Sequence, residues 1–188
     1  MPLFAPHLIS RLVVEQVLSD GVKNMSVLDL CTGSGCILLG LMTKESGISG
    51  TGADVSEKAL SVAKENARML KVDAKWLLSD LYAAVSGKYD VICSNPPYIK
   101  TSEIELLMPE VGKYEPRAAL DGGADGLDYY RKIVKDAPKF LNPGGRLYLE
   151  IGSEQGEAVK TLLEENGFNE VRIIRDYARL DRVVTGKV

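Results

Sequence analysis

The stretch SVLDLCTGSG, residues 26–35, decides the fold. Its first half is a short apolar run typical of a buried strand, and its second half is a turn rich in glycine. Residues 36–43 continue in a helical pattern, so we predict a strand, a tight turn and a helix in succession. Glycines in this turn would let a ligand approach the backbone, and free N–H groups at the helix start can bind a carboxylate or a phosphate.

The alternation of strand and helix continues on both sides of this stretch. Before it, apolar residues at helical spacing predict an amphipathic helix, at Leu8, Leu12, Val13, Val17 and Leu18. After it, strands are predicted at residues 50–55, 75–78, 89–94, 146–151, 171–175 and 182–185. Strands that alternate with helices predict an α/β fold, with a mostly parallel seven-stranded sheet and helices on both of its faces.

The intervening helices are predicted from their start and stop signals. They are expected at residues 56–70, 126–141 and 153–166. Ser56 and Ser153 are good N-cap residues for the first and last of them. The middle helix is expected to stop at the Asn-Pro-Gly-Gly of residues 142–145. The nearly all-apolar strand at 89–94 is expected at the centre of the sheet, and residues 99–125 are expected to form a long ordered insertion.

Composition and charge narrow the class of protein. The chain has 188 residues, 45% of them hydrophobic and 26% charged, a balance typical of one globular domain. Its net charge of −3 argues against direct binding to nucleic acid, which depends on neutralising phosphates. Three cysteines without a CxxC pair and a single histidine argue against a metal site and fit a reducing compartment. The N-terminus has the pattern of neither a signal peptide nor a membrane span, so we expect a cytoplasmic protein without a membrane partner.

Polar residues or glycines stand at the ends of four of the predicted strands or just after them, at residues 32–35, Asp54, Asp80 and residues 95–98. In parallel α/β sheets ligands bind at the carboxyl ends of the strands, so these residues are expected to form one site. Asp54 could accept both ribose hydroxyl protons, and Asp80 could reach an adenine amino group with Leu81 against the ring. Taken singly, each has a structural alternative: a tight turn, a helix-capping aspartate or a solvated turn aspartate.

The glycine-rich turn narrows the choice of nucleotide. A dinucleotide fingerprint needs a third glycine where Leu38 stands, and no Gly-Lys-Ser/Thr follows that would make a Walker loop. A nucleoside with a charged tail remains. S-adenosylmethionine fits this description, with its adenine at Asp80, its ribose at Asp54 and its methionine portion over residues 32–35.

Asn95-Pro96-Pro97-Tyr98 is the most specific feature of the sequence. Proline restricts the preceding residue to an extended geometry, which would fix Asn95 beside the predicted cofactor site. The Asn95 side-chain oxygen and the Pro96 carbonyl could each accept one N–H of a planar nitrogen, such as an amide or an exocyclic amine. Tyr98 could pack on the planar group. The alternative interpretation is a turn that ends a strand.

Read together, DLCTGSG, ADVS, SNPPYI, EVGKYEPRAALDGGADGLDYYRKI and PGGRLYLEIGSEQG resemble the PrmC/HemK family of protein-(glutamine-N5) methyltransferases. The resemblance covers about residue 26 to the C-terminus. It implies a Rossmann-like class I S-adenosylmethionine-dependent methyltransferase, which methylates the glutamine of the Gly-Gly-Gln motif in peptide-chain release factors. NPPY is shared with adenine-N6 and other amino methyltransferases, whereas residues 110–133 are more selective for this family.

The resemblance implies two sets of contacts. Contacts with the substrate glutamine fall on Asn95, Pro96, Pro97 and Tyr98, and residues 115–117 and 120–123 border the site. Contacts with the cofactor fall on Cys31, Thr32, Gly33, Ser34, Gly35, Asp54, Leu81 and Asn95, beside Asp80 from the strand-end argument. No metal is implied.

The chain departs from the family pattern in two places. Cys31 stands where the family usually has the first glycine of its cofactor loop, and a small side chain is tolerated there if the residue keeps a negative φ. Only about 25 residues precede the first predicted strand. We therefore expect one methyltransferase domain over residues 1–188, with an N-terminal helix in residues 1–25 and without the helical domain with which family members grip the release factor.

Two other functions stay open beside glutamine methylation of a release factor. One is an adenine-N6 or other amino methyltransferase that acts on nucleic acid. The other is a remnant that binds the cofactor without catalysis. The sequence gives no indication of the oligomeric state.

Overall fold

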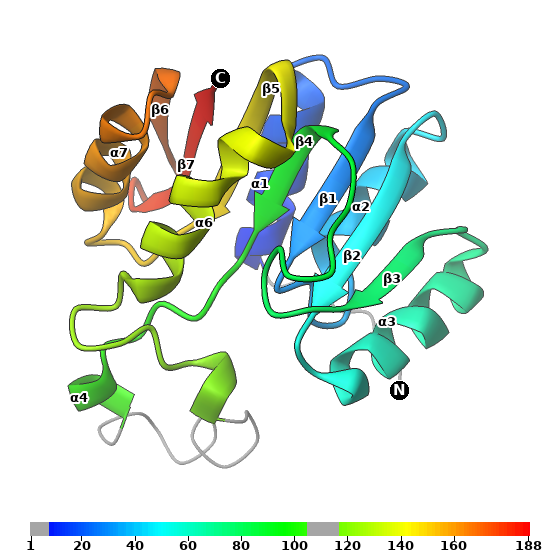
Figure 1. Ribbon diagram of the computed structural model, residues 1–188, viewed down its shortest axis with the longest axis horizontal. Helices are drawn as coiled ribbons and strands as arrows, with labels where there is room; N and C mark the ends of the chain where they lie inside the picture. Colours follow the sequence, from blue (N-terminus) through cyan, green and yellow to red (C-terminus); the bar gives the residue numbers. More distant parts are fainter. Residues whose placement is uncertain (1–7, 105–116) are drawn as a thin grey trace.

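The computed structural model describes residues 8–104 and 117–188 and is built on one sheet, with the strand order β3-β2-β1-β4-β5-β7-β6 (Figure 1). The strands are β1 (Ser26–Leu30), β2 (Ser49–Asp54), β3 (Lys75–Leu78), β4 (Tyr89–Ser94), β5 (Leu141–Glu150), β6 (Asn169–Arg175) and β7 (Asp181–Lys187). Neighbours among β1 to β5 are parallel, and β7 is antiparallel to both β5 and β6. The predicted seven-stranded, mostly parallel sheet with a central β4 is therefore confirmed.

Helices cover both faces of the sheet, because successive residues of a strand point to opposite faces. The helices are α1 (Leu8–Ser19), α2 (Cys36–Lys44), α3 (Glu57–Leu70), α4 (Thr101–Ile104), the 3-10 helix η1 (Arg117–Ala119), α6 (Asp128–Phe140) and α7 (Gly156–Glu165). Val27 and Val91 pack with α1 and α2, whereas Leu28 and Ile92 pack with α6 and α7. Within the described ranges, every helix is too short or too polar to cross a lipid bilayer.

The predicted start of β5 is wrong. The strand begins at Leu141 rather than at residue 146, and the register shifts after its first pair, Tyr89 with Leu141. The Asn-Pro-Gly-Gly stretch thus follows the end of the preceding helix, as predicted. It belongs to β5, however, at the place where the pairing of β5 with β4 shifts its register. The reason is a long-range contact, since the Asn142 side chain donates a hydrogen bond of 2.7 Å to Asp90 on β4.

Ser153 does not cap α7, against the prediction. The helix begins at Gly156, and Gln155 is its N-cap residue. The Gly152 N–H donates to the Gln155 side chain, and the Gln155 N–H donates to the Gly152 carbonyl, each at 3.0 Å. These bonds close a turn that moves the helix start past Ser153. The other predicted boundaries agree with the structure to within two residues.

The C-terminal end of α1 is fastened to the sheet through Asp20, which follows the last helical residue. The Asp20 carboxylate accepts hydrogen bonds from the Tyr148 hydroxyl at 2.8 Å and from the Arg172 guanidinium at 2.7 Å. Tyr148 is fully buried on β5. Burial alone would raise the pKa of Asp20, but the bonds from Tyr148 and Arg172 bring it below its ordinary value.

Two carboxyl groups are buried near the carboxyl ends of the central strands. Asp29 on β1 is 1% exposed, and Glu150, the last residue of β5, is 2% exposed. The Thr32 hydroxyl donates to Asp29 at 2.6 Å, and the Ser10 hydroxyl of α1 donates to Glu150 at 3.2 Å. Burial raises the pKa of both carboxyl groups to about 7. Each group therefore keeps its proton at a higher pH than an exposed carboxyl group does.

Tyr148→Phe should lower the free energy of unfolding by roughly 1–2 kcal/mol, because it leaves a partly buried carboxylate without one of its donors. Urea unfolding at neutral pH measures this loss. Tyr177→Phe is the matched control, since Tyr177 is 96% exposed, and it should change stability by less than about 0.5 kcal/mol. A Tyr148→Phe protein as stable as the wild type would contradict the anchoring of α1 through Asp20.

Glu150 should make the fold less stable as the pH rises. Its folded pKa of about 7 lies above the ordinary value of 4.5, so between these values the native state keeps a proton that the unfolded state has lost. The stabilisation is complete below the unfolded pKa and is lost as the pH rises through the folded pKa. It amounts to roughly 2–3 kcal/mol between about pH 5 and pH 8.

Urea unfolding across this pH range tests the effect. Glu150→Gln should flatten the decline by that amount, whereas Glu154→Gln, on an exposed residue, should keep the wild-type dependence. The same decline in Glu150→Gln as in the wild type would show that another group is responsible.

Candidate functional site

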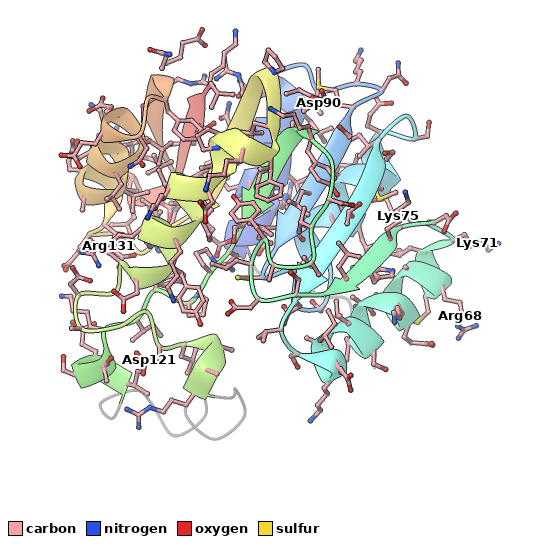
Figure 2. All side chains as sticks on the ribbon, viewed as in Figure 1. Arg68, Lys71, Lys75, Asp90, Asp121 and Arg131 are labelled. Atoms are coloured by element: carbon pink, nitrogen blue, oxygen red, sulfur yellow. The ribbon has the colours of Figure 1, made fainter. Side chains whose placement is uncertain are left out.

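The residues predicted to form one site follow strands whose carboxyl ends point to the same edge of the sheet (Figure 1). The turn after β1 lies against the end of β2, because the Thr32 N–H donates to the Ala53 carbonyl at 3.0 Å and the Gly33 N–H to the Asp54 carboxylate at 2.8 Å. The Ser79 N–H donates to the Asp54 carbonyl at 2.9 Å, which brings the turn after β3 alongside. Asp121 also lies at this edge, while Asp90 lies at the opposite one (Figure 2).

The glycines of the turn after β1 have different surroundings. Gly33 and Gly35 both adopt left-handed backbone, with φ of +56° and +81°. A Cβ on Gly35 would lie 3.0 Å from atoms of Leu39 and Trp76, so this glycine is needed for packing. Apart from its chain neighbours, a Cβ on Gly33 would meet no atom of residues 8–104 or 117–188 within 4 Å. The backbone at Gly33 therefore faces open space that a ligand can use.

Cys31 adopts a left-handed conformation with φ of +53°, so the condition of a negative φ, under which a side chain is tolerated at this position, is not met. The chain must turn sharply after Leu30 for Thr32 and Gly33 to reach the end of β2. Left-handed backbone costs a residue with a Cβ roughly 1–2 kcal/mol. Burial raises the pKa of the Cys31 thiol, and a hydrogen bond with Ser94 lowers it by less. The resulting pKa is about 12. The thiol is therefore neutral at physiological pH.

The Asp54 carboxylate is fixed at the end of β2. Its Oδ2 accepts the bond from Gly33, and its Oδ1 accepts one from the Ser56 N–H at 2.9 Å. Each carboxylate oxygen has a second lone pair, so Asp54 can still accept two hydroxyl protons from a ligand. Ser56 caps α3 as predicted, since its hydroxyl accepts a bond from the Ala59 N–H at 3.2 Å.

Apolar surface is exposed beside Asp54 and Asp80. Val55 is 68% and Leu78 50% exposed, at the ends of β2 and β3. Asp80 is exposed, and Leu81 after it has a left-handed φ of +48°. The Ser79 hydroxyl fixes this turn by donating to the Leu81 carbonyl at 2.8 Å. Apolar side chains next to an acceptor suit a flat ring with an amino group at its edge.

Two buried residues that the sequence analysis missed support the turn after β1. Asn66 on α3 is fully buried, and its amide donates to the Ser34 carbonyl at 3.0 Å. Asp29 accepts the hydroxyl proton of Thr32. The signal for Asn66 was present, because it interrupts the otherwise apolar buried face of α3. For Asp29 the signal was a carboxylate within an apolar strand.

Residues 95–98, the NPPY turn, leave the central strand at the same edge. The Ser94 hydroxyl donates to the Leu30 carbonyl at 2.9 Å, which joins the ends of β4 and β1. The two prolines are buried, and Asn95 and Tyr98 are half-buried. Within residues 8–104 and 117–188, no hydrogen bond engages the Asn95 side chain. Its amide is therefore available to a ligand.

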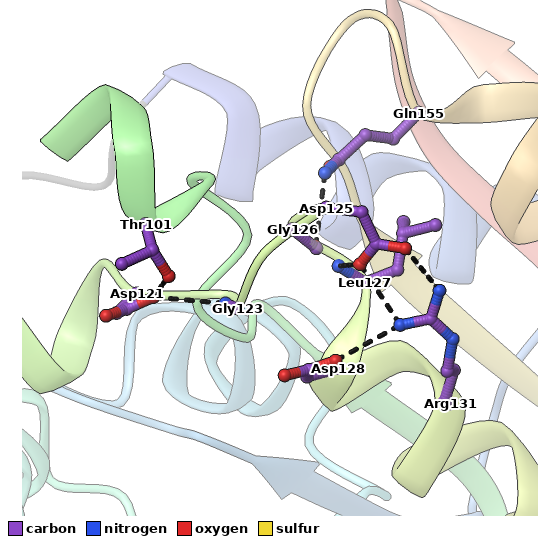
Figure 3. Close-up of polar contacts among 9 residues, drawn as sticks. All are labelled: Thr101, Asp121, Gly123, Asp125, Gly126, Leu127, Asp128, Arg131 and Gln155. Atoms are coloured by element: carbon purple, nitrogen blue, oxygen red, sulfur yellow. Dashed lines mark hydrogen bonds and ion pairs between the residues drawn. The ribbon is translucent and has the colours of Figure 1, made fainter.

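The second half of the insertion lies against the NPPY turn. The Ile99 N–H donates to the Leu120 carbonyl at 3.0 Å, and the Gly122 N–H donates to the Ile99 carbonyl at 2.8 Å. A Cβ on Gly122 would lie 2.7 Å from the Tyr98 Cα, so only glycine allows this approach. Asp121 accepts bonds from the Thr101 hydroxyl at 2.6 Å and from the Gly123 N–H at 3.1 Å (Figure 3). Residues 120–123 thus border the turn, whereas residues 105–116, with 115 and 116 of the predicted border, lie outside the described residues.

Known proteins similar to this chain are methyltransferases. The family model "Methyltransferase small domain" matches residues 8–110, more than half of the chain. A release factor glutamine methyltransferase of Cereibacter sphaeroides is 47% identical over 165 residues, and one of Geobacter sulfurreducens is 40% identical over 180 residues. These matches cover 87% and 95% of this chain, but 59% and 63% of the relatives. The chain thus spans about three fifths of their length.

Solved structures of methyltransferases share the fold along the whole chain. A methyltransferase from Pyrococcus furiosus superposes with a TM-score of 0.72 at 19% identity, covering 100% of this chain and 86% of that one. The Thermus thermophilus 16S rRNA N2 G1207 methyltransferase, solved with AdoMet and guanosine, has a TM-score of 0.70 at 20% identity and covers 100% and 44%. The predicted Rossmann-like class I methyltransferase fold is confirmed. On the match of its family model, the chain belongs to the methyltransferase small domain family.

Proposed function

We propose that this chain is the catalytic part of a release factor glutamine methyltransferase. In this proposal it transfers the methyl group of S-adenosyl-L-methionine to the side-chain nitrogen N5 of the glutamine in the Gly-Gly-Gln motif of a peptide-chain release factor. Relatives named for that activity are 38–47% identical to it. The observation that carries the proposal is the Asn95 amide at the end of β4, which no hydrogen bond engages among the described residues, one strand away from the backbone of Gly33.

The residues around the glycine-rich turn fit S-adenosyl-L-methionine. The open backbone at Gly33 suits a methionine portion, and the spare lone pairs of Asp54 suit a ribose. The apolar surface of Val55 and Leu78 suits an adenine ring. When bound, this cofactor supplies an activated methyl group on a sulfonium. The residues proposed to hold it are Cys31, Thr32, Gly33, Ser34, Gly35, Asp54, Asp80, Leu81 and Asn95.

The NPPY turn would present the acceptor nitrogen. The Asn95 side-chain oxygen and the Pro96 carbonyl each accept one N–H of the substrate amide, and the Tyr98 ring packs on its plane. An amide nitrogen is a poor nucleophile because its lone pair is delocalised. The orientation of this nitrogen therefore contributes more to methyl transfer than a general base would. Positioning of the acceptor nitrogen, together with carbonyl dipoles that point at it, can lower the activation barrier of methyl transfer by several kcal/mol. The proton leaves the nitrogen after methyl transfer.

The proposed partner is a protein rather than a nucleic acid. The net charge of −3 gives little attraction to phosphates. Translation termination takes place in the cytoplasm, so we propose that the protein acts there. In this proposal residues 1–188 form one methyltransferase domain, with its catalytic residues on loops of one sheet edge.

Incubation of the protein with methyl-labelled cofactor and a peptide-chain release factor should label the factor once, at the glutamine of Gly-Gly-Gln. Mass spectrometry locates the added methyl group. Replacing that glutamine by alanine should abolish labelling, because the proposed acceptor nitrogen is then missing. Label on RNA or DNA instead of the protein would overturn the proposal, and cofactor binding without transfer to any release factor would favour a non-catalytic remnant.

Asn95→Ala should reduce the rate of methyl transfer by roughly a hundredfold or more, because the acceptor nitrogen loses its orienting oxygen. Cofactor affinity, measured by calorimetry, should change by less than about tenfold, since the other cofactor-binding residues are untouched. Asn169→Ala is the control, as Asn169 is exposed at the start of β6. Full activity of Asn95→Ala would rule out the proposed role of this amide.

A further inference from the structure

One side chain, that of Gln155, joins the NPPY turn to two other parts of the chain. Its amide nitrogen donates to the carbonyl of Gly126 at 3.2 Å (Figure 3). The same nitrogen donates to the carbonyl of Tyr98 at 3.0 Å. The Gln155 amide oxygen accepts a bond from the Gly152 N–H at 3.0 Å. The Tyr130 hydroxyl lies 3.5 Å from this oxygen and donates its proton to the Glu150 carbonyl at 2.9 Å. A primary amide has two donor hydrogens, and the carbonyls of Tyr98 and Gly126 use both of them.

Two of these partners are glycines because the amide leaves no room for a side chain. A Cβ on Gly126 would lie 2.5 Å from the Tyr98 carbonyl oxygen and 2.7 Å from the Gln155 amide nitrogen. A Cβ on Gly152 would lie 2.9 Å from the Gln155 amide oxygen and 3.5 Å from the Tyr98 ring. The surroundings are therefore shaped around this amide, and Gly152 lies next to the Tyr98 ring as well.

The position of Gln155 at a helix start does not explain its side chain. Gln155 is the N-cap residue of α7, yet its side chain makes no capping bond to the helix. Serine, threonine, aspartate and asparagine are the residues that cap a helix well. The bonds of the Gln155 amide go instead to Tyr98, Gly126 and Gly152, which all lie outside α7.

The NPPY turn has a particular need for an outside donor. Pro96 and Pro97 have no N–H, so the turn cannot be tied down by backbone donors at these two residues. The Tyr98 carbonyl directly follows them, and the Ile99 N–H after it bonds to Leu120. A donor at the Tyr98 carbonyl therefore fixes the turn between the prolines and the insertion.

We infer that Gln155 is a positioning residue for the proposed methyl transfer, which sets the orientation of the Asn95 and Pro96 oxygens by holding the Tyr98 carbonyl. The inference rests on the proposed function for its catalytic part only. Gln155 touches neither the glycine-rich turn nor Asp54, so its loss should slow methyl transfer without weakening cofactor binding.

Gln155→Glu is the sharpest variant, because it keeps the size and the accepting oxygen but replaces the donor nitrogen. At about pH 8 the ionised carboxylate would repel the carbonyls of Tyr98 and Gly126, and kcat should fall at least tenfold with the cofactor Kd within twofold. At about pH 6 a carboxyl between two carbonyls takes up a proton and can donate again. The ratio of variant to wild-type kcat should therefore rise several-fold as the pH falls.

Asn166→Asp is the matched control at the other end of α7, where the Asn166 amide donates to the Leu162 carbonyl at 2.8 Å. It makes the same exchange of amide for acid and should keep kcat within twofold at both pH values. Hydrogen exchange of the ligand-free protein gives a second measurement, independent of activity. Peptides over residues 98–104 and 120–127 should exchange several-fold faster in Gln155→Glu than in the wild type or the control.

The outcomes separate the two proposals. Unchanged exchange in Gln155→Glu would overturn the inference, whatever the protein methylates. Three outcomes that accompany faster exchange would overturn the positioning role. They are an unchanged kcat, an equal loss of kcat at both pH values, and weaker cofactor binding. A wild-type protein that labels no release factor contradicts the proposed function, while the exchange measurement still decides whether Gln155 holds the turn.

Discussion

The hydrogen bond from the Ser94 hydroxyl to the Leu30 carbonyl joins the last residues of the two strands from which the candidate site departs. The glycine-rich turn begins directly after Leu30, and the NPPY turn begins directly after Ser94. Because β1 and β4 are parallel and paired up to this point, the two turns leave the sheet side by side. Parallel pairing thus provides, without any special loop, the proximity that a transfer between two bound groups needs.

The backbone near this point is strained rather than relaxed. Cys31 and Leu81 both have left-handed φ values without being glycines, and both belong to the proposed cofactor site. Backbone strain of this kind persists only where the surroundings fix it. For Cys31 the surroundings are the bonds from Thr32 and Gly33 to the end of β2, and for Leu81 the bond from Ser79. The site geometry is therefore set by the packing of strand ends more than by local preference.

Much of the fold could be predicted from local pattern, and the exceptions have a common cause. Residues 75–78 and 89–94 are strands with the predicted bounds, because each apolar run ends where its turn residues begin. The start of β5 depends on the bond from Asn142 to Asp90, and the start of α7 on the turn around Gln155.

The candidate site divides in the same way. Its strand-end residues could be predicted from their position, whereas the supporting residues could not. Asn66 reaches Ser34 and Gln155 reaches Tyr98 across 32 and 57 positions of the chain. Periodicity and turn signals carry no information on such distant partners. The left-handed φ of Cys31 could not be predicted for a related reason, because bonds to β2 impose it.

The supports of the NPPY turn come from a different length of chain than the glycine-rich turn and the acidic strand ends. The glycine-rich turn and the acidic strand ends lie within residues 31–81. The supports of the NPPY turn lie within residues 99–155, beyond the central strand. The proposed site is thus divided along the sequence, with β4 between its two parts. One part can diverge while the other stays constant. A chimera that exchanges residues 99–155 between relatives would change the supports of the NPPY turn and leave the proposed cofactor-binding residues unchanged.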